Sequence, residues 1–300
     1  MIISTHMKHI RKITIIANYR KKKALEAGSS LVNEFRSKGI DVSMPDLTGY
    51  FDKPEEDEGY KVIASSSREA NALIILGGDG TLLTTVRAIA QYEIPILPIN
   101  VSGMGFLSEI DYTEKERALE ALIKGDYTLE RRMLLNVEVG HWKSIYLNEL
   151  VIHRGLSTQV AHITINREGK VPITFSGDGL VVSTPTGSTA YSLSAGGPVI
   201  DPSLDLVLYT PICPHPQFIA PFILPTYEKV KITGKIAGGT NVTITVDGQV
   251  TRDITKNDEI NISKSKYNLS LIRIKEWELF RVLRERWNWR DMREDKATEE

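Results

Sequence analysis

The fold is decided by the stretch ALIILGGDGT, residues 72–81, in which an apolar run leads directly into a glycine-rich turn. A continuous apolar run of this length predicts a strand buried on both faces, because a strand with one wet face would alternate apolar and polar residues. Val86, Ile89 and Ala90 follow at helical spacing and predict a helix after the turn. Strand, short turn and helix in this order are typical of an α/β domain with a parallel sheet.

The alternation of strand and helix extends outward from this stretch in both directions. Strands are predicted at residues 13–17, 40–43 and 94–99, and helices at residues 22–38 and 113–124. The acidic residues 52–58 predict a surface loop. We therefore expect residues 1–125 to form an α/β domain whose parallel sheet is covered by helices on both faces.

After Gly125 the pattern changes to short β-type segments separated by Gly, Asn, Asp and Pro. These segments are residues 134–139, 144–147, 162–166, 180–183, 230–232, 242–246 and 268–274. Residues 126–275 are accordingly expected to form a β-rich domain, either a sandwich or a layered sheet. Residues 276–290 return to helical spacing, and we expect residues 276–300 to form a C-terminal helix and a charged tail that packs back on the N-terminal domain.

The bulk composition excludes several classes of protein. The formal net charge of −1 argues against a general nucleic-acid binder, which needs a marked basic excess. No apolar stretch approaches the roughly 18 residues that a membrane helix requires. Cys213 is the single cysteine, so an intrachain disulfide cannot form, which fits a reducing compartment. A cytoplasmic protein is the expectation.

The turn at residues 77–81 is the first candidate site. Gly77, Gly78 and Gly80 lack a Cβ, so phosphate oxygens can approach the backbone N–H groups, and Thr81 opens the helix behind them. Asp79 is a carboxylate within this anion cradle. It makes chemical sense if it accepts a hydrogen bond from a hydroxyl, takes the proton of that hydroxyl, or holds a metal ion near the phosphates. The structural alternative is a tight turn with Asp79 as a helix N-cap.

A second candidate site covers residues 176–198, a run dense in glycines and hydroxyl groups. Such donors suit a polyhydroxylated, phosphorylated ligand whose base stacks on Tyr191. The alternative is a turn-rich structural segment. A third candidate is Asn148-Glu149, whose side chains would point to opposite faces of a strand unless the strand ends there.

Several common sites are not supported by the sequence. The six histidines show no metal-ligand spacing, so no protein metal site is predicted. Neither a Gly-x-Gly-x-x-Gly fingerprint, nor a Walker A motif, nor a Gly-x-Ser-x-Gly elbow occurs. A Rossmann oxidoreductase, a P-loop kinase and a serine hydrolase of that type therefore lack support.

Taken together, these motifs resemble those of the NAD kinase family. The agreement covers residues 77–81, 100–107, 148–149, 178–198, 211–215, 247–249 and 280–284, in order along most of the chain. The run TPTGSTAY at residues 184–191 is highly specific, whereas Gly-Gly-Asp-Gly is shared with phosphofructokinases and lipid kinases. One departure is Ala220, which stands where the family often has an arginine.

The resemblance implies an NAD kinase-like fold with the site between the two domains. It also implies transfer of a phosphoryl group to the 2′-hydroxyl of the adenosine ribose of NAD, with Asp79 as general base or hydroxyl-orienting residue. The substrate-binding residues that it implies are Gly80, Asn148, Glu149, Asp178, Thr189, Ala190, Tyr191, Ser192, Leu193 and Ser194, with Ser176, His162 and Gln249 as weaker candidates. Asp178 would lie near the nicotinamide. The family forms homodimers or homotetramers in which a neighbouring subunit can complete the site.

The resemblance leaves the phosphoryl donor open among ATP, another nucleotide and polyphosphate. It also leaves open the preference for NAD or NADH and the choice between dimer and tetramer. Mg²⁺ or another divalent cation is expected with the donor phosphates. The competing interpretations are a lipid or sugar kinase built on the same glycine-rich turn, and an NAD(P)-sensing module without turnover. Retention of Asp79 counts against the sensing module, because a pure binder has little need of a carboxylate beside phosphates.

Overall fold

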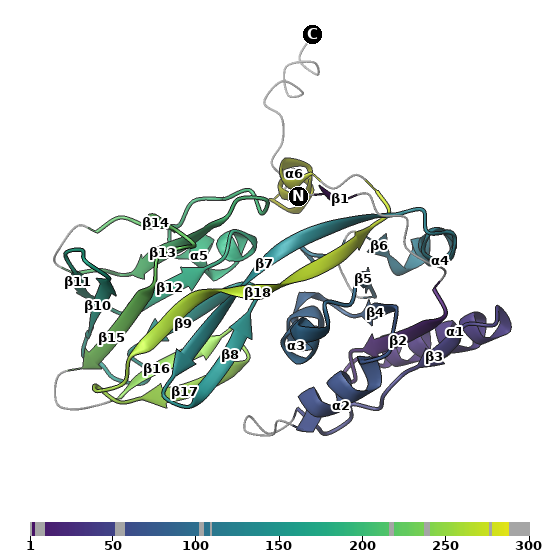
Figure 1. The fold of residues 1–300 in the computed structure, drawn as a ribbon, viewed down its shortest axis with the longest axis horizontal. Helices are drawn as coiled ribbons and strands as arrows, with labels where there is room; N and C mark the ends of the chain where they lie inside the picture. Colours follow the sequence, from purple (N-terminus) through teal and green to yellow (C-terminus); the bar gives the residue numbers. More distant parts are fainter. Residues whose placement is uncertain are drawn as a thin grey trace, which may run out of the picture.

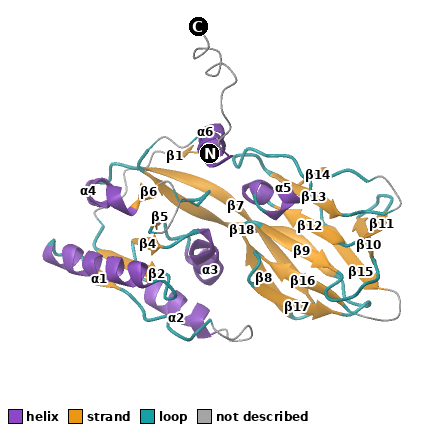
Figure 2. Cartoon of the chain, turned by 180° about the vertical axis from the view of Figure 1, so that it is seen from behind, coloured by secondary structure: helices purple, strands orange, loops and turns teal. Residues whose placement is uncertain are grey.

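The computed structural model confirms the predicted fold class, an α/β part followed by a β-rich part (Figure 1). It describes residues 2–3, 10–51, 58–101, 105–108, 110–215, 219–236, 241–275 and 278–287. Most of the predicted acidic loop and the charged tail after residue 290 lie outside the described residues. Most of the helices lie in one half of the molecule and most of the strands in the other, as Figure 2 shows.

Four parallel strands form the sheet of the N-terminal half, in the order β3-β2-β4-β5. They are β2 (Lys12–Ala17), β3 (Asp41–Ser43), β4 (Ala72–Leu76) and β5 (Ile96–Asn100). The helices around them are α1 (Lys22–Ser37), α2 (Glu58–Ser67), α3 (Asp79–Ile89) and α4 (Lys115–Lys124). Every residue of β4 is buried, as its continuous apolar run predicts.

Alternate residues of β4 belong to two hydrophobic cores, one on each face of this sheet. Ile74 and Leu76 pack in the core that includes α1 and α4, whereas Leu73 and Ile75 pack in the core that includes α2 and α3. The chain therefore leaves β2 for a helix on one face and leaves the neighbouring β4 for a helix on the other. Loops that part in this way form a crevice at the carboxyl ends of the strands, where open α/β sheets bind ligands.

One long strand, β18 (Ile260–Arg273), belongs to both halves of the molecule (Figure 1). It pairs in parallel with β5 and antiparallel with β7 (Thr128–Val139). The resulting sheet has 12 strands. At its β-rich end it continues through β15 (Val230–Ile236), β10 (Ala161–Arg167) and β11 (Ile173–Gly177). The strands β1 (Ile2–Ile3), β6 (Ile110–Asp111) and β8 (Trp142–Tyr146) pair beside this path.

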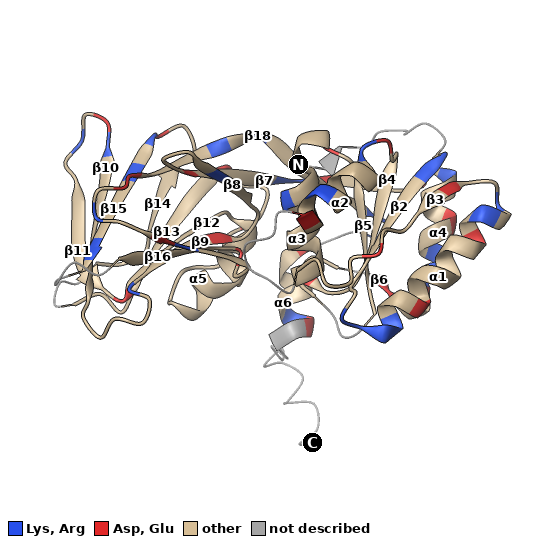
Figure 3. Ribbon diagram, turned by 90° about the horizontal axis from the view of Figure 1, so that it is seen from below, with Lys and Arg blue, Asp and Glu red and all other residues tan. Residues whose placement is uncertain are grey.

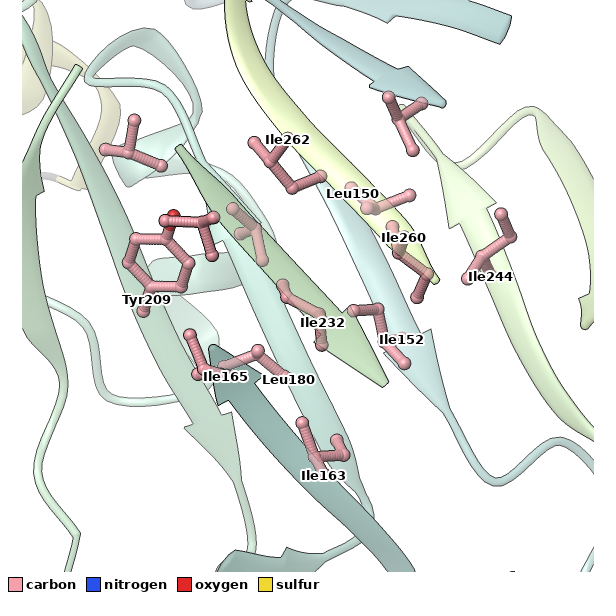
Figure 4. Close-up of a cluster of buried hydrophobic side chains, with 14 of the residues drawn as sticks. Leu150, Ile152, Ile163, Ile165, Leu180, Tyr209, Ile232, Ile244, Ile260 and Ile262 are labelled. Carbon is pink, nitrogen blue, oxygen red and sulfur yellow. The ribbon is translucent and has the colours of Figure 1, made fainter. Parts of the chain in front are cut away.

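A second, antiparallel sheet of six strands covers the β-rich end of the first, in the order β14-β13-β12-β9-β16-β17. Its strands are β9 (Glu149–His153), β12 (Gly179–Ser183), β13 (Leu206–Ile212), β14 (Phe222–Pro225), β16 (Val242–Val246) and β17 (Val250–Ile254). Between the sheets, Ile163 and Ile232 of the first pack in one core with Ile152 and Leu180 of the second (Figure 4).

The sequence underestimates the extent of the β-rich half. β7 and β18 begin well before the predicted segments at residues 134–139 and 268–274, because charged residues such as Glu130 and Arg132 interrupt the apolar pattern. The strands β9, β11, β13, β14 and β17 are not predicted at all. Three of these, β11, β14 and β17, are edge strands, which depend on their neighbour more than on an alternation of their own.

Short helical segments complete the fold. They are η1 (Ala90–Tyr92), η2 (Tyr112–Glu114), η3 (Thr186–Thr189), α5 (Tyr191–Ser194) and α6 (Leu279–Trp287). Within the described residues, every helix is too short or too polar to span a bilayer. Lys and Arg alternate with Asp and Glu over both halves (Figure 3), in keeping with the net charge of −1.

Candidate active site

Asp79 is the first residue of α3, and its carboxylate is held by a loop from after β5. The Phe106 N–H donates to Asp79 Oδ2 at 2.7 Å, and the Leu107 N–H donates to Asp79 Oδ1 at 3.2 Å. The N-cap of α3 is Gly78, so the alternative of Asp79 as a helix N-cap is wrong. The side chain instead reaches a loop that is 27 to 28 residues further along the chain.

Gly105 allows this loop to close on the carboxylate. A Cβ on Gly105 would lie 2.0 Å from Asp79 Oδ1, a separation that real Cβ atoms essentially never show. Two backbone donors and the N-terminus of α3 all interact favourably with a negative charge. The carboxylate is therefore fixed in position.

A small cavity of about 70 Å³ lies beside this carboxylate, and we call it the Asp79 cavity. Its wall combines residues of both halves: Asp79, Phe106, Leu107, Arg132, Asn148, Pro185, Thr186, Thr189, Ala190, Ile200, Pro202 and Leu279. Four residues implied by the resemblance, Asp79, Asn148, Thr189 and Ala190, thus come together at one place. The Asp79 cavity has room for one chemical group rather than a whole dinucleotide, since typical ligand sites enclose roughly 300–1,000 Å³.

Arg132 is a residue of this wall that the sequence analysis missed. Its Nη2 lies 2.6 Å from Glu130 Oε1, and Glu130 also pairs with Arg273 Nη2 at 2.6 Å. Burial lowers the pKa of Arg132 to about 10, with Glu130 opposing the shift, so the guanidinium remains charged at neutral pH. A glutamate and an arginine two positions apart in an apolar strand share one face. That spacing is the pattern that could have indicated a buried ion pair.

Asn148 lies at the end of a turn that is held by hydrogen bonds from Thr184, a residue of the hydroxyl-rich run. The Thr184 N–H donates to the Asn148 carbonyl at 3.0 Å, and Thr184 Oγ1 donates to the Leu147 carbonyl at 2.5 Å. Because β9 starts at Glu149, Asn148 lies outside the strand and its side chain is free of the alternation rule. Asn148 lines the Asp79 cavity while Glu149 is buried behind it.

Glu149 is a buried carboxyl group with one unpartnered oxygen. Its side chain is 7% exposed, and Oε2 has no hydrogen-bond partner among the described residues. Burial, together with the nearby Asp247 carboxylate, raises the pKa of Glu149 to about 8, although a hydrogen bond from the backbone of Tyr191 opposes the shift. The group is therefore mostly protonated at neutral pH and can both donate and accept hydrogen bonds.

Asp247 fixes the backbone of the same turn from the other side. It accepts hydrogen bonds from the N–H groups of Leu147 at 3.2 Å, Asn148 at 2.8 Å and Glu149 at 3.2 Å. It also pairs with Arg87 Nη2 at 3.1 Å, and both side chains are buried. Since Arg87 belongs to α3, this ion pair ties the helix that carries Asp79 to the turn that carries Asn148.

Gln249 adds a second tie between the two halves. Its Nε2 donates to the Gly80 carbonyl at 2.7 Å, and its Oε1 accepts from Thr84 Oγ1 and Arg87 Nη1, each at 3.1 Å. We call the contacts of Arg87, Asp247 and Gln249 the α3 junction. The sequence motif at residues 247–249 indicated family membership, but it did not indicate this role.

A larger cavity of about 540 Å³ also borders the glycine-rich turn, and we call it the Gly80 cavity. Its wall includes four of the predicted residues, Gly78, Gly80, Thr81 and Gln249. Gly77, by contrast, is buried within the turn and lines neither cavity. The turn thus borders two cavities, contributing Asp79 to one and Gly78 and Gly80 to the other.

Three predicted residues lie far from Asp79 within one subunit. His162 and Ser176 face each other across β10 and β11, with Nδ1 and Oγ 2.7 Å apart. Asp178 follows β11 and pairs with Arg154 Nε at 2.7 Å. β10 and β11 lie at the outer end of the β-rich half, whereas α3 lies near the middle of the molecule (Figure 1). None of the three residues lines the Asp79 cavity or the Gly80 cavity.

The remaining predicted residues belong to α5, next to the Asp79 cavity. Tyr191 is 44% exposed, as a base-stacking side chain requires. Ser192 is fully buried, and its Oγ lies 2.7 Å from Thr210 Oγ1. Leu193 is half-buried and Ser194 is exposed. Ser192 therefore anchors α5 to β13, while Tyr191 and Ser194 remain accessible to a ligand.

Two models of one family match the chain. The model described as the ATP-NAD kinase N-terminal domain matches residues 13–127, and the one described as the ATP-NAD kinase C-terminal domain matches residues 147–274. An NAD kinase of Ruminiclostridium cellulolyticum is 35% identical over 280 residues, which cover 92% of this chain and 97% of that protein. An NAD kinase of Clostridium botulinum is 40% identical over 228 residues, covering 75% and 80%.

Two solved structures share the fold. Yeast NADH kinase, complexed with NADH, has a TM-score of 0.81 at 23% identity, covering 94% of this chain and 89% of that chain. An NAD kinase from Archaeoglobus fulgidus, in complex with ATP, has a TM-score of 0.71 at 21% identity, covering 93% and 100%. These structures share the fold, and the sequence relatives favour a dinucleotide kinase over a lipid or sugar kinase and over an NAD(P)-sensing module.

Proposed function

Because this chain belongs to the NAD kinase family and phosphorylates NAD to give NADP, we propose that Asp79 acts on the ribose hydroxyl that receives the phosphoryl group. The observation that carries this proposal is the geometry of the carboxylate, which two backbone N–H groups hold in the wall of a cavity between the two halves. A ribose hydroxyl is a poor nucleophile at neutral pH, so a fixed carboxylate that orients or deprotonates it supplies what the reaction needs.

In this proposal the 2′-hydroxyl of the adenosine ribose occupies the Asp79 cavity and donates a hydrogen bond to Asp79. Its proton passes to that carboxylate as the oxygen attacks the terminal phosphorus of the donor. Phe106 and Leu107 keep the carboxylate in place through their N–H groups. Arg132, a buried cation in the same wall, favours the negative charge that gathers at the transferred group.

The rest of NAD is proposed to extend from this cavity over the hydroxyl-rich run. Asn148 and Glu149 hydrogen-bond the dinucleotide, with Gly80 beside it. The stretch Thr189, Ala190, Tyr191, Ser192, Leu193 and Ser194 lines the adenine and ribose pocket. His162, Ser176 and Asp178 contribute only if a second subunit brings them to the site, and we therefore propose a homodimer or homotetramer. We also propose that the enzyme acts in the cytoplasm, because a single cysteine fits a reducing compartment.

ATP is the donor that we propose, as expected from an archaeal structural neighbour whose structure was solved in complex with ATP; polyphosphate is the second candidate. A divalent cation, Mg²⁺, would neutralise part of the charge on the donor phosphates. Among the described residues, no three His, Cys, Asp or Glu side chains cluster as a metal site. Mg²⁺ bound mainly by phosphates and water needs only one or two carboxylates.

The test is NADP formation by the Asp79→Asn variant, measured alongside equilibrium binding of NAD. Turnover should fall by about 10²–10⁴, the usual contribution of general base catalysis, while the dissociation constant for NAD changes by less than about threefold. Full turnover in a folded variant would remove Asp79 from its proposed role. Parallel assays of the wild type with ATP, tripolyphosphate, NAD and NADH identify the donor and acceptor.

A further inference from the structure

We propose that Arg273 is a positioning residue for the reaction, because it holds the loop whose backbone N–H groups fix the Asp79 carboxylate. The inference rests on the proposed function, since it names what keeps the proposed base in place. Arg273 is the last residue of β18, and it lines neither the Asp79 cavity nor the Gly80 cavity. Any effect of this side chain on the reaction therefore has to pass through another residue.

Leu107 is the residue that connects Arg273 to Asp79. Arg273 Nη1 donates a hydrogen bond to the Leu107 carbonyl at 3.0 Å. The N–H of the same leucine donates to Asp79 Oδ1 at 3.2 Å. Because a single Cα joins the two rigid peptide planes of Leu107, a shift of its carbonyl also shifts its N–H donor. The guanidinium thus acts on the carboxylate through one residue of the loop.

The Arg273 side chain is itself fixed by Glu130, across the paired strands β7 and β18. Glu130 Oε2 accepts a hydrogen bond from Arg273 Nε at 2.7 Å and lies 2.6 Å from Nη2. Glu130 is opposite Leu271, so Arg273, two residues further along β18, points to the same face of the sheet. Both side chains are buried. A planar guanidinium that is held along one edge has a fixed direction for its remaining donor.

Glu130 also connects this contact to another part of the wall of the Asp79 cavity. Its Oε1 lies 2.6 Å from Arg132 Nη2, and Arg132 Nη1 donates to Thr186 Oγ1 at 3.4 Å. Arg132 and Thr186 both line the Asp79 cavity. One buried carboxylate therefore lies between the loop that holds Asp79 and the hydroxyl-rich run proposed to bind the acceptor. This position suits a group that sets the placement of the base relative to the acceptor.

The competing explanation is a buried ion pair that only stabilises the packing of β7 on β18. Any cation that pairs with Glu130 would fill such a role, and the bond from Arg273 Nη1 to the Leu107 carbonyl would be unnecessary. A structural role would also lower turnover in the same proportion whether or not Asp79 is present. A positioning role requires that the effect of Arg273 depend on Asp79.

The experiment is a double-mutant cycle between positions 273 and 79. Arg273→Met and Arg273→Lys are made in the wild type and in the Asp79→Asn variant, and kcat and the KM for NAD and MgATP are measured. Lysine keeps a cation beside Glu130, but its single ammonium lacks the fork that reaches both Glu130 and the Leu107 carbonyl. Urea unfolding reports the stability of each variant, and Arg273→Lys carries the cycle if Arg273→Met does not fold.

Arg167→Met is the matched control. Arg167 Nη1 lies 3.7 Å from Glu228 Oε2, and these side chains are only 19% and 12% exposed. Arg167 belongs to β10, at the outer end of the β-rich half (Figure 1), and lines neither cavity. Its replacement should lower the urea midpoint while kcat stays within about twofold, because the pair is distant from the Asp79 loop.

In the wild-type background, both Arg273 variants should lower kcat by about 10²-fold, the cost of misplacing a reacting group by about 1 Å. The KM values should change by less than about threefold, since Arg273 lines neither cavity. In the Asp79→Asn background, the same substitutions should change kcat by less than about threefold, because the group that Arg273 positions is already missing.

Three results would overturn the inference. They are equal losses of kcat in both backgrounds, recovery of kcat by Arg273→Lys, and wild-type kcat in a folded Arg273→Met variant. Full turnover of the Asp79→Asn variant alone would instead contradict the proposed function, and the inference that rests on it would fail for that separate reason.

Discussion

The tripeptide Gly-Asp-Gly occurs twice in this chain, at residues 78–80 and at residues 177–179, with opposite surroundings. In the first copy, the glycines face open space and the aspartate lines a cavity. In the second, a Cβ on Gly177 would lie 2.8 Å from the Ile212 carbonyl, and one on Gly179 would lie 2.2 Å from the Ile152 carbonyl. Asp178 of that copy pairs with Arg154, and both side chains are partly exposed.

The comparison of the two copies shows two different reasons why a position requires glycine. At residues 78–80 the missing side chains leave room for a ligand, whereas at residues 177–179 they leave room for neighbouring strands of the second sheet. The same contrast holds for the acids. Asp79 is held by backbone donors of a distant loop, while Asp178 pairs with the partly exposed Arg154. A pair of this kind contributes little to stability. A motif therefore indicates chemistry only through what surrounds it.

The largest expected effect separates the two aspartates. Asp79→Asn should lower kcat by about 10²–10⁴, whereas Asp178→Asn should leave kcat within about threefold, because it lies far from the reacting hydroxyl in the same subunit. Any role of Asp178 in binding from a neighbouring subunit would appear in the KM for NAD. Steady-state kinetics of both variants provide the measurement, and equal losses of kcat would remove the distinction.

The next effect concerns the ion pairs beside each turn. Arg87→Leu leaves the buried Asp247 without its cation, so the free energy of unfolding should fall by about 3 kcal/mol. Turnover should fall too, because α3 loses its tie to the Asn148 turn. Arg154→Leu removes the corresponding partner of Asp178 and should cost less than about 1 kcal/mol. Urea unfolding of both variants gives the comparison, and similar losses would show that burial does not distinguish the pairs.

Substitution of a glycine by alanine should reduce stability in the second copy and activity in the first. Gly179→Ala places a methyl group against a backbone carbonyl, and overpacking of this kind costs about 2–3 kcal/mol. Gly78→Ala has room and an extended φ of −106°, so its stability should be unchanged within about 0.5 kcal/mol. Gly78→Ala should nevertheless lose activity, because the methyl group obstructs the phosphates. Melting temperatures and kcat/KM are measured together, and an active Gly78→Ala enzyme would contradict the phosphate role.

The smallest expected effect is a pH dependence of the free energy of unfolding. It arises at Glu149, next to Asn148 in the wall of the Asp79 cavity. The folded-state pKa of Glu149 is raised to about 8 from an ordinary value of 4.5, so the folded protein keeps a proton that the unfolded chain releases. Between pH 6 and pH 7 the free energy of unfolding should therefore fall by up to about 1 kcal/mol. The Glu149→Gln variant should lack this decline. Urea titrations at both pH values test it, and parallel curves for the two proteins would refute the shift.

Most of the N-terminal fold could be predicted because its elements carry their own patterns, although the helix α2 was not predicted. Strand β4 coincides with the predicted run, since a fully buried strand needs apolar residues at every position. Strand β17 escaped prediction because it is an edge strand with three exposed residues in succession. Strand β13 contains Pro211, which counts against a strand in a sequence pattern.

The site could be predicted only where a motif carries the chemistry within itself. Asp79, Asn148 and Thr189 come from such motifs, and they meet at one cavity. Arg87 and Asp247 are 160 residues apart in sequence, and neither has a neighbour in the chain that reveals the other. Arg132 lies in the first part of β7, which the sequence pattern does not predict as a strand because of its charged residues. Long-range pairing of this kind depends on the packed fold rather than on local sequence.

The strand β18 has a consequence for how the chain is made. It supplies the partner of β5 at Leu271, a residue synthesised long after Ile96. During translation, the N-terminal sheet therefore emerges with part of its β5 edge uncovered, and such an edge invites pairing with other chains. A ribosome-bound or truncated chain that stops before Ile260 should need protection from a chaperone, while the finished protein closes the edge with its own last strand.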